Sequence, residues 1–253
     1  MIKDTEDVYR ELEFGQWSQR QGLEKGERFM IAKFLDPAKR TLEAGAGGGR
    51  ILLAMQAAGF TELSGFDILP EFVEAARKRD TTGSIDFTVQ DGRKLTYADE
   101  SFDQLVYLQQ FISLVGPEAD GLQAVGEAFR VLRPGGSVII SLLSMRARKR
   151  RYWPLLAWLK LLRVATFRRL SLQYQPWLRL NNAPNYPALL DRGPYVYWFL
   201  EKEAVELFAS AGFLVEAIGS DAQIDAGQLL PPPCVPADAP FRGRIYMVCK
   251  KPQ

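Results

Sequence analysis

Histidine is absent from this chain of 253 residues, and its only two cysteines, Cys234 and Cys249, are isolated. Histidine is the usual general base near neutral pH, and histidine and cysteine are the usual zinc ligands. Two isolated thiols also give no indication of a disulfide framework. We therefore expect no metal site and, if the chain is an enzyme, a reaction that needs little general acid–base chemistry.

Long apolar runs are also lacking, because no stretch of about 18 uninterrupted apolar residues occurs. The first residues, 1–6, do not show the basic and then apolar pattern of a signal peptide. We therefore expect a cytoplasmic protein without a membrane-spanning segment. The hydrophobic share of 47% is enough for a substantial core, and the length fits one domain, residues 1–253, with an insertion.

What the chain does contain is a glycine-rich turn within residues 41–50, followed by the apolar run 51–55. This order predicts a buried strand, a turn and a helix, and Gly45 and Gly47 leave no Cβ between the backbone and a ligand. Glu43 beside the turn would repel a pyrophosphate, but it suits a ligand that carries cationic groups. The dinucleotide fingerprint would place a third glycine at position 50, where this chain has arginine.

A second acid, Asp67, ends the next apolar segment, where its carboxylate could accept both hydroxyls of a ribose. With these motifs the chain resembles the class I S-adenosylmethionine-dependent methyltransferases. The resemblance covers residues 28–143 well and 198–250 loosely. The matching residues are Glu43-x-Gly45-x-Gly47-x-Gly49, Asp67, Gln90-Asp91-Gly92 and Leu132-Arg133-Pro134-Gly135-Gly136.

The resemblance implies S-adenosyl-L-methionine as the cofactor and a Rossmann-like, doubly wound α/β fold. Its seven-stranded sheet would have the order 3-2-1-4-5-7-6, with the last strand antiparallel. In this fold Asp91 would receive the adenine amino group, and Gly92 would let the backbone come close beneath the ring. The cofactor-binding residues implied are Glu43, Gly45, Gly47, Asp67, Ile68, Asp91, Gly92 and Leu108.

The apolar segments themselves alternate in the manner of an α/β protein. Pro134–Gly136 predicts a turn before the fifth strand. Strands are expected at about residues 40–44, 62–67, 85–89, 101–108, 137–143, 213–219 and 245–250, and helices at about 48–58, from 70 onward, at 118–132 and at 201–211.

The catalytic candidates are Gln109, Gln110 and Tyr9. The two glutamines follow the fourth strand, near the point where ligands bind in open α/β sheets, and they can orient a nucleophile without titrating. Tyr9 and Trp17 belong to an N-terminal helical segment, residues 1–38, which in the resembled family packs over the cofactor. Trp17 is a substrate-binding candidate, and ordinary core packing is the alternative interpretation for both aromatic residues.

Residues 145–200 interrupt the alternation with a basic and aromatic insertion. Ten basic and no acidic residues lie between positions 145 and 180, together with three of the five tryptophans. Such a segment suits a lid over the substrate, a membrane-surface helix, a nucleic-acid groove or a dimer contact. In the resembled family, insertions at this point cap the active site. We favour a lid, with Tyr186, Tyr195 and Tyr197 as substrate-binding candidates.

The sequence thus predicts methyl transfer from S-adenosylmethionine to a small-molecule or lipophilic acceptor by in-line attack. The alternatives are an RNA or protein methyltransferase and a non-catalytic sensor that binds the cofactor. Nucleic acid is the weaker choice, because no separate nucleic-acid domain is evident and no Asn-Pro-Pro-Tyr tetrapeptide follows the fourth strand. The basic insertion could also form a peripheral membrane contact or the interface of a homodimer.

Overall fold

The computed structural model describes residues 5–253, without the side chain of Arg150, and its centre is a seven-stranded sheet. The strand order is β10-β11-β5-β4-β1-β2-β3, and β11 is antiparallel to both neighbours. The predicted α/β fold and strand order are therefore confirmed. The strands are β1 (Thr41–Ala44), β2 (Leu63–Asp67), β3 (Asp86–Val89), β4 (Phe102–Tyr107), β5 (Leu132–Leu143), β10 (Leu214–Ser220) and β11 (Arg244–Lys250).

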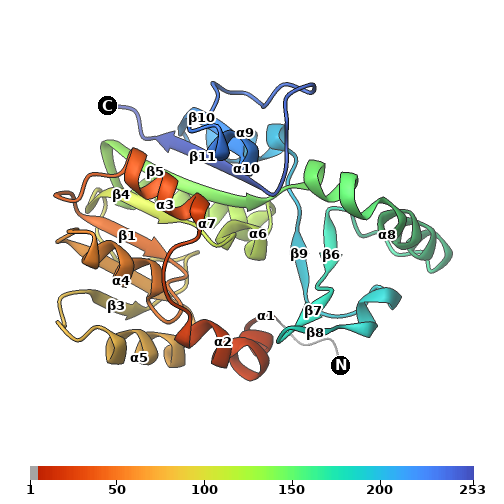
Figure 1. Cartoon of the computed structure of the whole chain (residues 1–253), viewed down its shortest axis with the longest axis horizontal. Helices are drawn as coiled ribbons and strands as arrows, with labels where there is room; N and C mark the ends of the chain where they lie inside the picture. The colour runs from red at the N-terminus through yellow and green to blue at the C-terminus, as the bar shows by residue number, and fades with distance from the viewer. Residues whose placement is uncertain (1–4) are drawn as a thin grey trace.

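Helices cover both faces of the sheet, and each face has its own apolar core (Figure 1). Side chains from α3, α4, α5 and α10 belong to one core, and those from α6, α7 and α9 belong to the other. Burial on both faces explains why the strands are near-continuous apolar runs. The helices are α3 (Lys25–Phe34), α4 (Arg50–Ala57), α5 (Pro70–Arg79), α6 (Phe111–Val115), α7 (Ala119–Val131), α9 (Glu201–Ser210) and α10 (Asp221–Asp225).

The segment Pro134–Gly136, predicted as a turn before the fifth strand, lies inside β5. Leu132 pairs with Phe102 but Ser137 pairs with Gln104, so the residues between Leu132 and Ser137 are left out of the β4 ladder. Pro134 has no N–H to donate, and the chain bulges at this point. The fifth strand therefore begins directly after α7, earlier than the glycine and proline signals indicate.

The N-terminal segment forms short helices that pack beside the glycine turn. Arg79 of α5 joins these helices to the glycine turn. Its guanidinium donates to the carbonyl of Ser18 (2.9 Å) and to that of Gly48 (2.6 Å). The first four residues of the predicted segment 1–38 lie outside the described part of the chain. The described elements are α1 (Thr5–Val8), the π-helix η1 (Tyr9–Glu13) and α2 (Phe14–Gln19), followed by α3.

Residues 145–200 form a cap that projects from the end of β5, on the right in Figure 1. Its long helix is kinked at Tyr152, whose φ and ψ are −124° and 29°, close to Pro154. A buried ion pair joins the helix to the rest of the cap, because Arg163 donates to both oxygens of Asp191 (2.8 and 2.7 Å). The elements are α8 (Met145–Ala165), β6 (Tyr174–Pro176), β7 (Arg179–Leu180), β8 (Ala183–Pro184), the 3-10 helix η2 (Tyr186–Leu190) and β9 (Tyr195–Tyr197).

Candidate functional site

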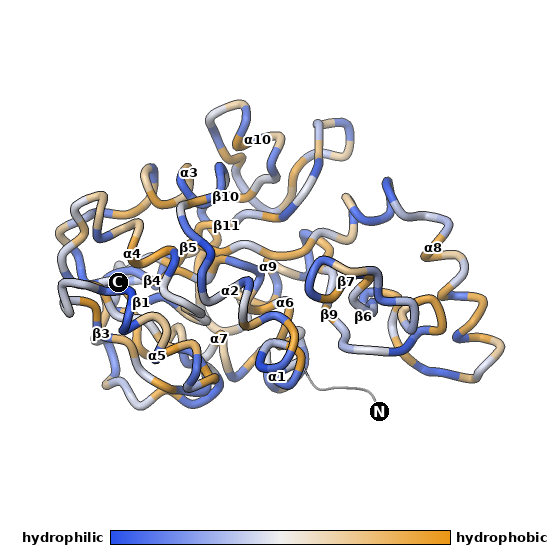
Figure 2. The backbone as a smooth tube through the Cα atoms, turned by 60° about the horizontal axis from the view of Figure 1, so that its bottom comes forward, coloured by the Kyte–Doolittle hydropathy of each residue, from blue (hydrophilic) through white to orange (hydrophobic). Residues whose placement is uncertain are grey.

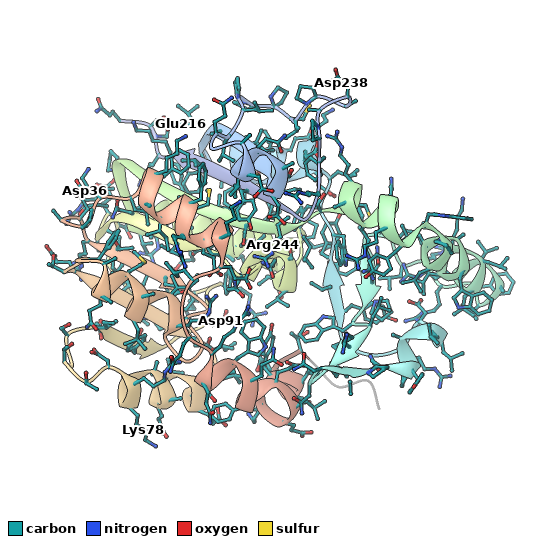
Figure 3. All side chains as sticks on the ribbon, viewed as in Figure 1. Asp36, Lys78, Asp91, Glu216, Asp238 and Arg244 are labelled. Atoms are coloured by element: carbon teal, nitrogen blue, oxygen red, sulfur yellow. The ribbon has the colours of Figure 1, made fainter. Side chains whose placement is uncertain are left out.

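A cavity of about 450 Å³ lies at the carboxyl ends of β1, β2 and β4, the place where open α/β sheets bind ligands. The N-terminal helices close it from the other side. Asp91, labelled in Figure 3, lies between the sheet and these helices. All eight residues predicted to bind the cofactor line this cavity: Glu43, Gly45, Gly47, Asp67, Ile68, Asp91, Gly92 and Leu108.

The glycine turn exposes its backbone to this cavity. Gly45 and Gly47 have φ values of 63° and 52°, in the left-handed region that favours glycine. A Cβ built on Gly47 would meet nothing within 4 Å, so only open space faces this position. The Gly47 N–H donates to Asp67 Oδ2 (2.9 Å), and Asp67 Oδ1 accepts from the N–H of Leu69 (3.0 Å). The turn and the end of β2 thus hold one another in place.

Asp67 is fixed by these backbone contacts, and a carboxylate has more acceptor sites than they occupy. Burial raises the pKa of its carboxyl above the usual value, and the backbone hydrogen bonds from Leu69, Gly47 and Ile68 partly offset that effect. The carboxylate is therefore oriented at the cavity wall with capacity to accept a further hydrogen bond.

Glu43 is a buried carboxylate that is only partly satisfied. Its side chain is 3% exposed, and its Oε2 has no hydrogen-bond partner. Burial raises the pKa of Glu43 well above the usual value; attraction by Arg50 opposes this shift, and repulsion from Glu27 and Asp67 adds to it. An uncompensated buried carboxylate is costly, so this arrangement favours a ligand that brings positive charge.

A buried ion pair beneath the cavity has no local sequence signal. Arg50, at the start of α4, donates to Glu27 on α3 through two hydrogen bonds of 2.7 Å, and the two side chains are 6% and 1% exposed. Gln109 also donates through its side chain to Glu27. Arg50 stood out in the sequence only as a departure from the dinucleotide fingerprint. Its partner lies on a different helix, so sequence spacing could not reveal the pair.

Gln109 and Gln110 occupy a tight turn at the end of β4. Their φ values are 55° and 60°, which is uncommon for two consecutive residues other than glycine. Such strain is found where surrounding contacts fix a functional site. Gln109 lines the first cavity and a second, adjoining one, whereas Gln110 lines only the second. The backbone N–H of Gln110 donates to Ser141 Oγ (3.4 Å).

Tyr9 lies at the junction of the two cavities and lines both. Its ring meets that of Trp177 edge to face, with centroids 5.5 Å apart. Burial, together with the negative charges of Glu13 and Asp67, raises the pKa of the Tyr9 hydroxyl above its usual value. The hydroxyl is therefore protonated at neutral pH and can act as a donor. Trp17 also lines both cavities and donates to Glu13 Oε2 (3.2 Å).

The second cavity, of about 320 Å³, separates the N-terminal helices from the cap. Of the cap residues predicted to bind substrate, Tyr186 is 71% exposed and lines neither cavity. Tyr195 and Tyr197 do not line a cavity either, because their hydroxyls donate to the Asp191 carbonyl and to Glu203.

The alternation along the strand β9 explains this placement. Neighbouring residues of a strand point to opposite sides, so Val196 and Trp198 line the second cavity while Tyr195 and Tyr197 face away from it. The sequence pattern did not specify which face of the strand meets the cavity. The cap contributes Arg148, Pro176, Trp177, Leu178, Arg179, Asn182, Val196 and Trp198 to the cavity wall.

The described residues, 5–253, contain no group of three or more histidine, cysteine, aspartate or glutamate side chains that could hold a metal ion. Within the same residues, no helix combines the length and the apolar character needed to cross a membrane.

Comparison with known proteins gives matches over part of the chain. Residues 42–140 match the family model described as a methyltransferase domain. A ubiquinone/menaquinone biosynthesis C-methyltransferase from Desulfotalea psychrophila is 31% identical over 118 residues, 46% of each chain. A ubiquinone biosynthesis O-methyltransferase from Xanthomonas campestris is 28% identical over 119 residues, 46% of this chain and 48% of the relative. The matched segment thus spans about half the length of these curated relatives.

Solved structures share the fold at lower identity. An S-adenosylmethionine-dependent methyltransferase from Methanosarcina mazei superposes with a TM-score of 0.63 at 19% identity, over 88% of this chain and 97% of that one. The [4+2]-cyclase SpnF superposes with a TM-score of 0.56 at 16% identity, over 93% of this chain and 85% of that one. The second structure shows that the fold is also found in a protein named for a different reaction.

Proposed function

We propose that this chain, which carries a methyltransferase domain in residues 42–140, transfers a methyl group from S-adenosylmethionine to a small or lipophilic acceptor. The observation that carries the proposal is the unpaired, buried Glu43 Oε2 beside a glycine turn held by Asp67. A negatively charged site of this kind opposes a dinucleotide pyrophosphate and suits a cationic cofactor. When bound, the cofactor supplies an electrophilic methyl group on a sulfonium.

The residues at the first cavity fit such a cofactor. Glu43 would balance the positive charge at its amino-acid end, and Asp67 would accept a hydrogen bond from the ribose hydroxyls. Asp91 is held ionised, because its hydrogen bonds with the Arg93 guanidinium keep the pKa of this carboxyl below its usual range. We assign Asp91 to the adenine amino group. The backbone at Gly47 faces open space, so the cofactor could approach it closely.

The second cavity supports a small acceptor. It adjoins the cofactor cavity at Tyr9, Trp17 and Gln109, so an acceptor in it would reach the methyl group. Gln110 and the protonated Tyr9 hydroxyl can orient the nucleophile by hydrogen bonds, and the aromatic walls exclude water. A cavity of this size between the N-terminal helices and the cap suits a small molecule better than a protein or RNA chain. A non-catalytic sensor with the same sites is the second reading, and turnover of the cofactor distinguishes the two.

The first test is binding of the cofactor product. Calorimetry should show binding of S-adenosylhomocysteine and no measurable binding of NAD, because Glu43 and Asp67 disfavour a pyrophosphate. We expect EDTA to leave the affinity and the turnover of S-adenosylmethionine unchanged, since the site is proposed to work without metal. Tighter binding of NAD than of S-adenosylhomocysteine would overturn the proposal, and activity that is lost on chelation and restored by magnesium would overturn its metal-free form.

Replacing Asp67 by alanine should weaken S-adenosylhomocysteine binding by about 1.5–3 kcal/mol, the range for hydrogen bonds to a charged group. The Asp103→Ala variant is a suitable control, because Asp103 pairs with Arg133 at the other end of β4, outside both cavities. Calorimetry on both variants measures the difference. Equal affinities for the Asp67 variant and the unaltered protein would show that Asp67 does not hold the ribose.

The cap helix also supports the proposal of contact with an anionic membrane surface. One face of α8 is buried against the cap through Leu159 and Arg163, and an apolar face on the other side stays open. Trp153, Leu161 and Val164 on this open face are 68%, 63% and 67% exposed, and Phe167 just beyond the helix is 92% exposed. Orange and blue alternate along α8 in Figure 2, as expected for such a helix. The helix and the residues just after it also carry the exposed cations Lys149, Arg151, Lys160 and Arg169, and no acidic residue lies between positions 145 and 180.

Vesicle binding tests this contact. The protein should bind vesicles that contain phosphatidylglycerol, and binding should fall as salt rises, because screening shortens to about 8 Å at physiological ionic strength. The double variant Leu161→Ser and Val164→Ser should bind at least about tenfold more weakly, since each buried apolar side chain contributes about 1.5 kcal/mol or more. Leu214→Ser is the matched control, because Leu214 is 59% exposed on β10. Equal binding by both variants, or no binding to anionic vesicles, would refute the contact.

A further inference from the structure

Arg148, in the first turns of α8, is a buried cation without a carboxylate partner. Its side chain lines the second cavity, and the residue is 7% exposed. Its guanidinium lies over the rings of Tyr152 and Trp198, with its carbon 4.1 and 4.5 Å from their centroids. Its Nε donates to Gln175 Oε1 (2.7 Å). Among the described residues, no aspartate or glutamate forms an ion pair with it, and its two terminal nitrogens make no hydrogen bond.

Two further donors in the same cavity also lack acceptors. Trp177 and Trp198 both line it, and the indole Nε1 of each is buried without a hydrogen-bond partner. Most buried polar groups are hydrogen-bonded, because an unpaired one costs about 1–3 kcal/mol. The two terminal nitrogens of Arg148 and the two indole N–H groups around this cavity therefore form a set of donors without an acceptor among residues 5–253.

The acidic side chain of this cavity does not act as the acceptor for these donors. Glu13 lines the cavity from the N-terminal helices, and its oxygens accept from Trp17 Nε1 and from the backbone N–H of Asn181. The desolvation of Arg148 lowers the pKa of its guanidinium to about 10, and only Tyr152 adds a small opposing charge effect. Arg148 is therefore still charged at neutral pH, and it remains without a negative partner.

We propose, on the basis of the proposed methyl transfer, that the acceptor is an aromatic or lipophilic carboxylate, whose anionic group is bound by Arg148 with the indole N–H groups of Trp177 and Trp198. Because Nε is occupied by Gln175, the two terminal nitrogens form the open edge of the guanidinium, which matches a carboxylate in a bidentate arrangement. The stacked rings of Tyr152 and Trp198 keep this edge in place. The apolar body of the acceptor would then lie along the aromatic wall towards Gln109.

The experiment compares matched acids and amides in the presence of S-adenosylhomocysteine. The probes are benzoate, 4-hydroxybenzoate, 2-naphthoate and indole-3-acetate, each beside its carboxamide, and tryptophan emission or calorimetry measures their affinities. At least one acid should bind about tenfold or more tightly than its amide, as expected for a charge-assisted hydrogen bond. Arg148→Met should remove this preference, and Arg148→Lys should retain part of it.

Two other variants separate recognition from folding. Trp198→Phe keeps an aromatic ring but removes one N–H, so it should weaken the acids more than the amides. Arg192→Met is the matched control, because Arg192 is an exposed cation of the cap that lines neither cavity and should leave the preference unchanged. The inference is overturned if no acid of the panel binds more tightly than its amide, or if Arg148→Met, Arg148→Lys and Trp198→Phe all keep the full preference. Binding of S-adenosylhomocysteine without acid preference would leave the proposed function intact, whereas its absence would refute that function.

Discussion

Replacement of Glu43 by glutamine is expected to stabilise the free protein and to weaken its binding of S-adenosylmethionine at the same time. The carboxylate is buried, its Oε2 has no hydrogen-bond partner, and the attraction of Arg50 compensates its charge only in part. Glutamine has the same shape without the charge, and we expect the free energy of unfolding to rise by about 1–3 kcal/mol. Cofactor affinity should fall by about 1.5–3 kcal/mol, because the negative charge that balances the cationic cofactor is lost.

The gain in stability should depend on pH. In the folded chain the pKa of Glu43 is raised well above the ordinary value of 4.5, so the folded protein holds this proton more tightly than the unfolded chain. The contribution of this group to stability is therefore fully present below pH 4.5 and is lost as pH rises through the raised pKa. Glutamine does not titrate, so the free energy of unfolding of the variant should rise relative to that of the unaltered protein as pH increases through this range. Urea unfolding at several pH values measures the difference.

Glu27→Gln is the matched control, because Glu27 is equally buried but has both oxygens paired with Arg50. Breaking this pair leaves Arg50 without its partner and should lower the free energy of unfolding by about 3–5 kcal/mol. The two neighbouring glutamates thus predict opposite signs for the same substitution. Destabilisation by Glu43→Gln at neutral pH would show that Glu43 is satisfied in the free protein and would remove the main support for a cationic cofactor.

Arg163→Met should cause the largest loss of stability in the cap. Arg163 and Asp191 are 4% and 1% exposed, and methionine would leave the Asp191 carboxylate buried with less compensation. Arg163 also donates to the carbonyls of Ser171 (2.6 Å) and Tyr174 (2.7 Å), so it connects three parts of the cap. Breaking a buried pair of this kind costs about 3–5 kcal/mol. Denaturant unfolding followed by tryptophan emission reports on this loss.

The second arginine on the same carboxylate serves as the control. Arg168 reaches Asp191 at 3.1 Å, but its side chain is 37% exposed, so Arg168→Met should cost less than about 1 kcal/mol. If the cap unfolds separately from the sheet, the Arg163→Met variant should show two unfolding transitions. The protein should still bind S-adenosylhomocysteine after the first of them. Equal losses for the two arginine variants would contradict the assignment of the buried pair as the main stabilising contact of the cap.

The features that could be predicted from the sequence are those encoded by neighbouring residues. The strand order followed from the family resemblance, and the alternation of apolar segments placed the strands to within a few residues. Glu43, the glycine turn and Asp67 directly follow or end strands, and parallel strands end at one edge of the sheet. The family resemblance implied eight cofactor-binding residues, and all eight line one cavity.

The sequence by itself thus determined the sheet and the order of the motifs that line the first cavity, because short-range patterns of burial and turn formation encode them. Only the tertiary structure decided which side chains meet across elements. It paired Arg50 with Glu27 and Arg163 with Asp191, and it turned Trp198 rather than Tyr197 towards the second cavity. It also buried Arg148, one of ten basic residues that look alike in the sequence, without a carboxylate partner among residues 5–253. Such partners are separated along the chain, and their contact depends on how helices and strands pack, which no local pattern specifies.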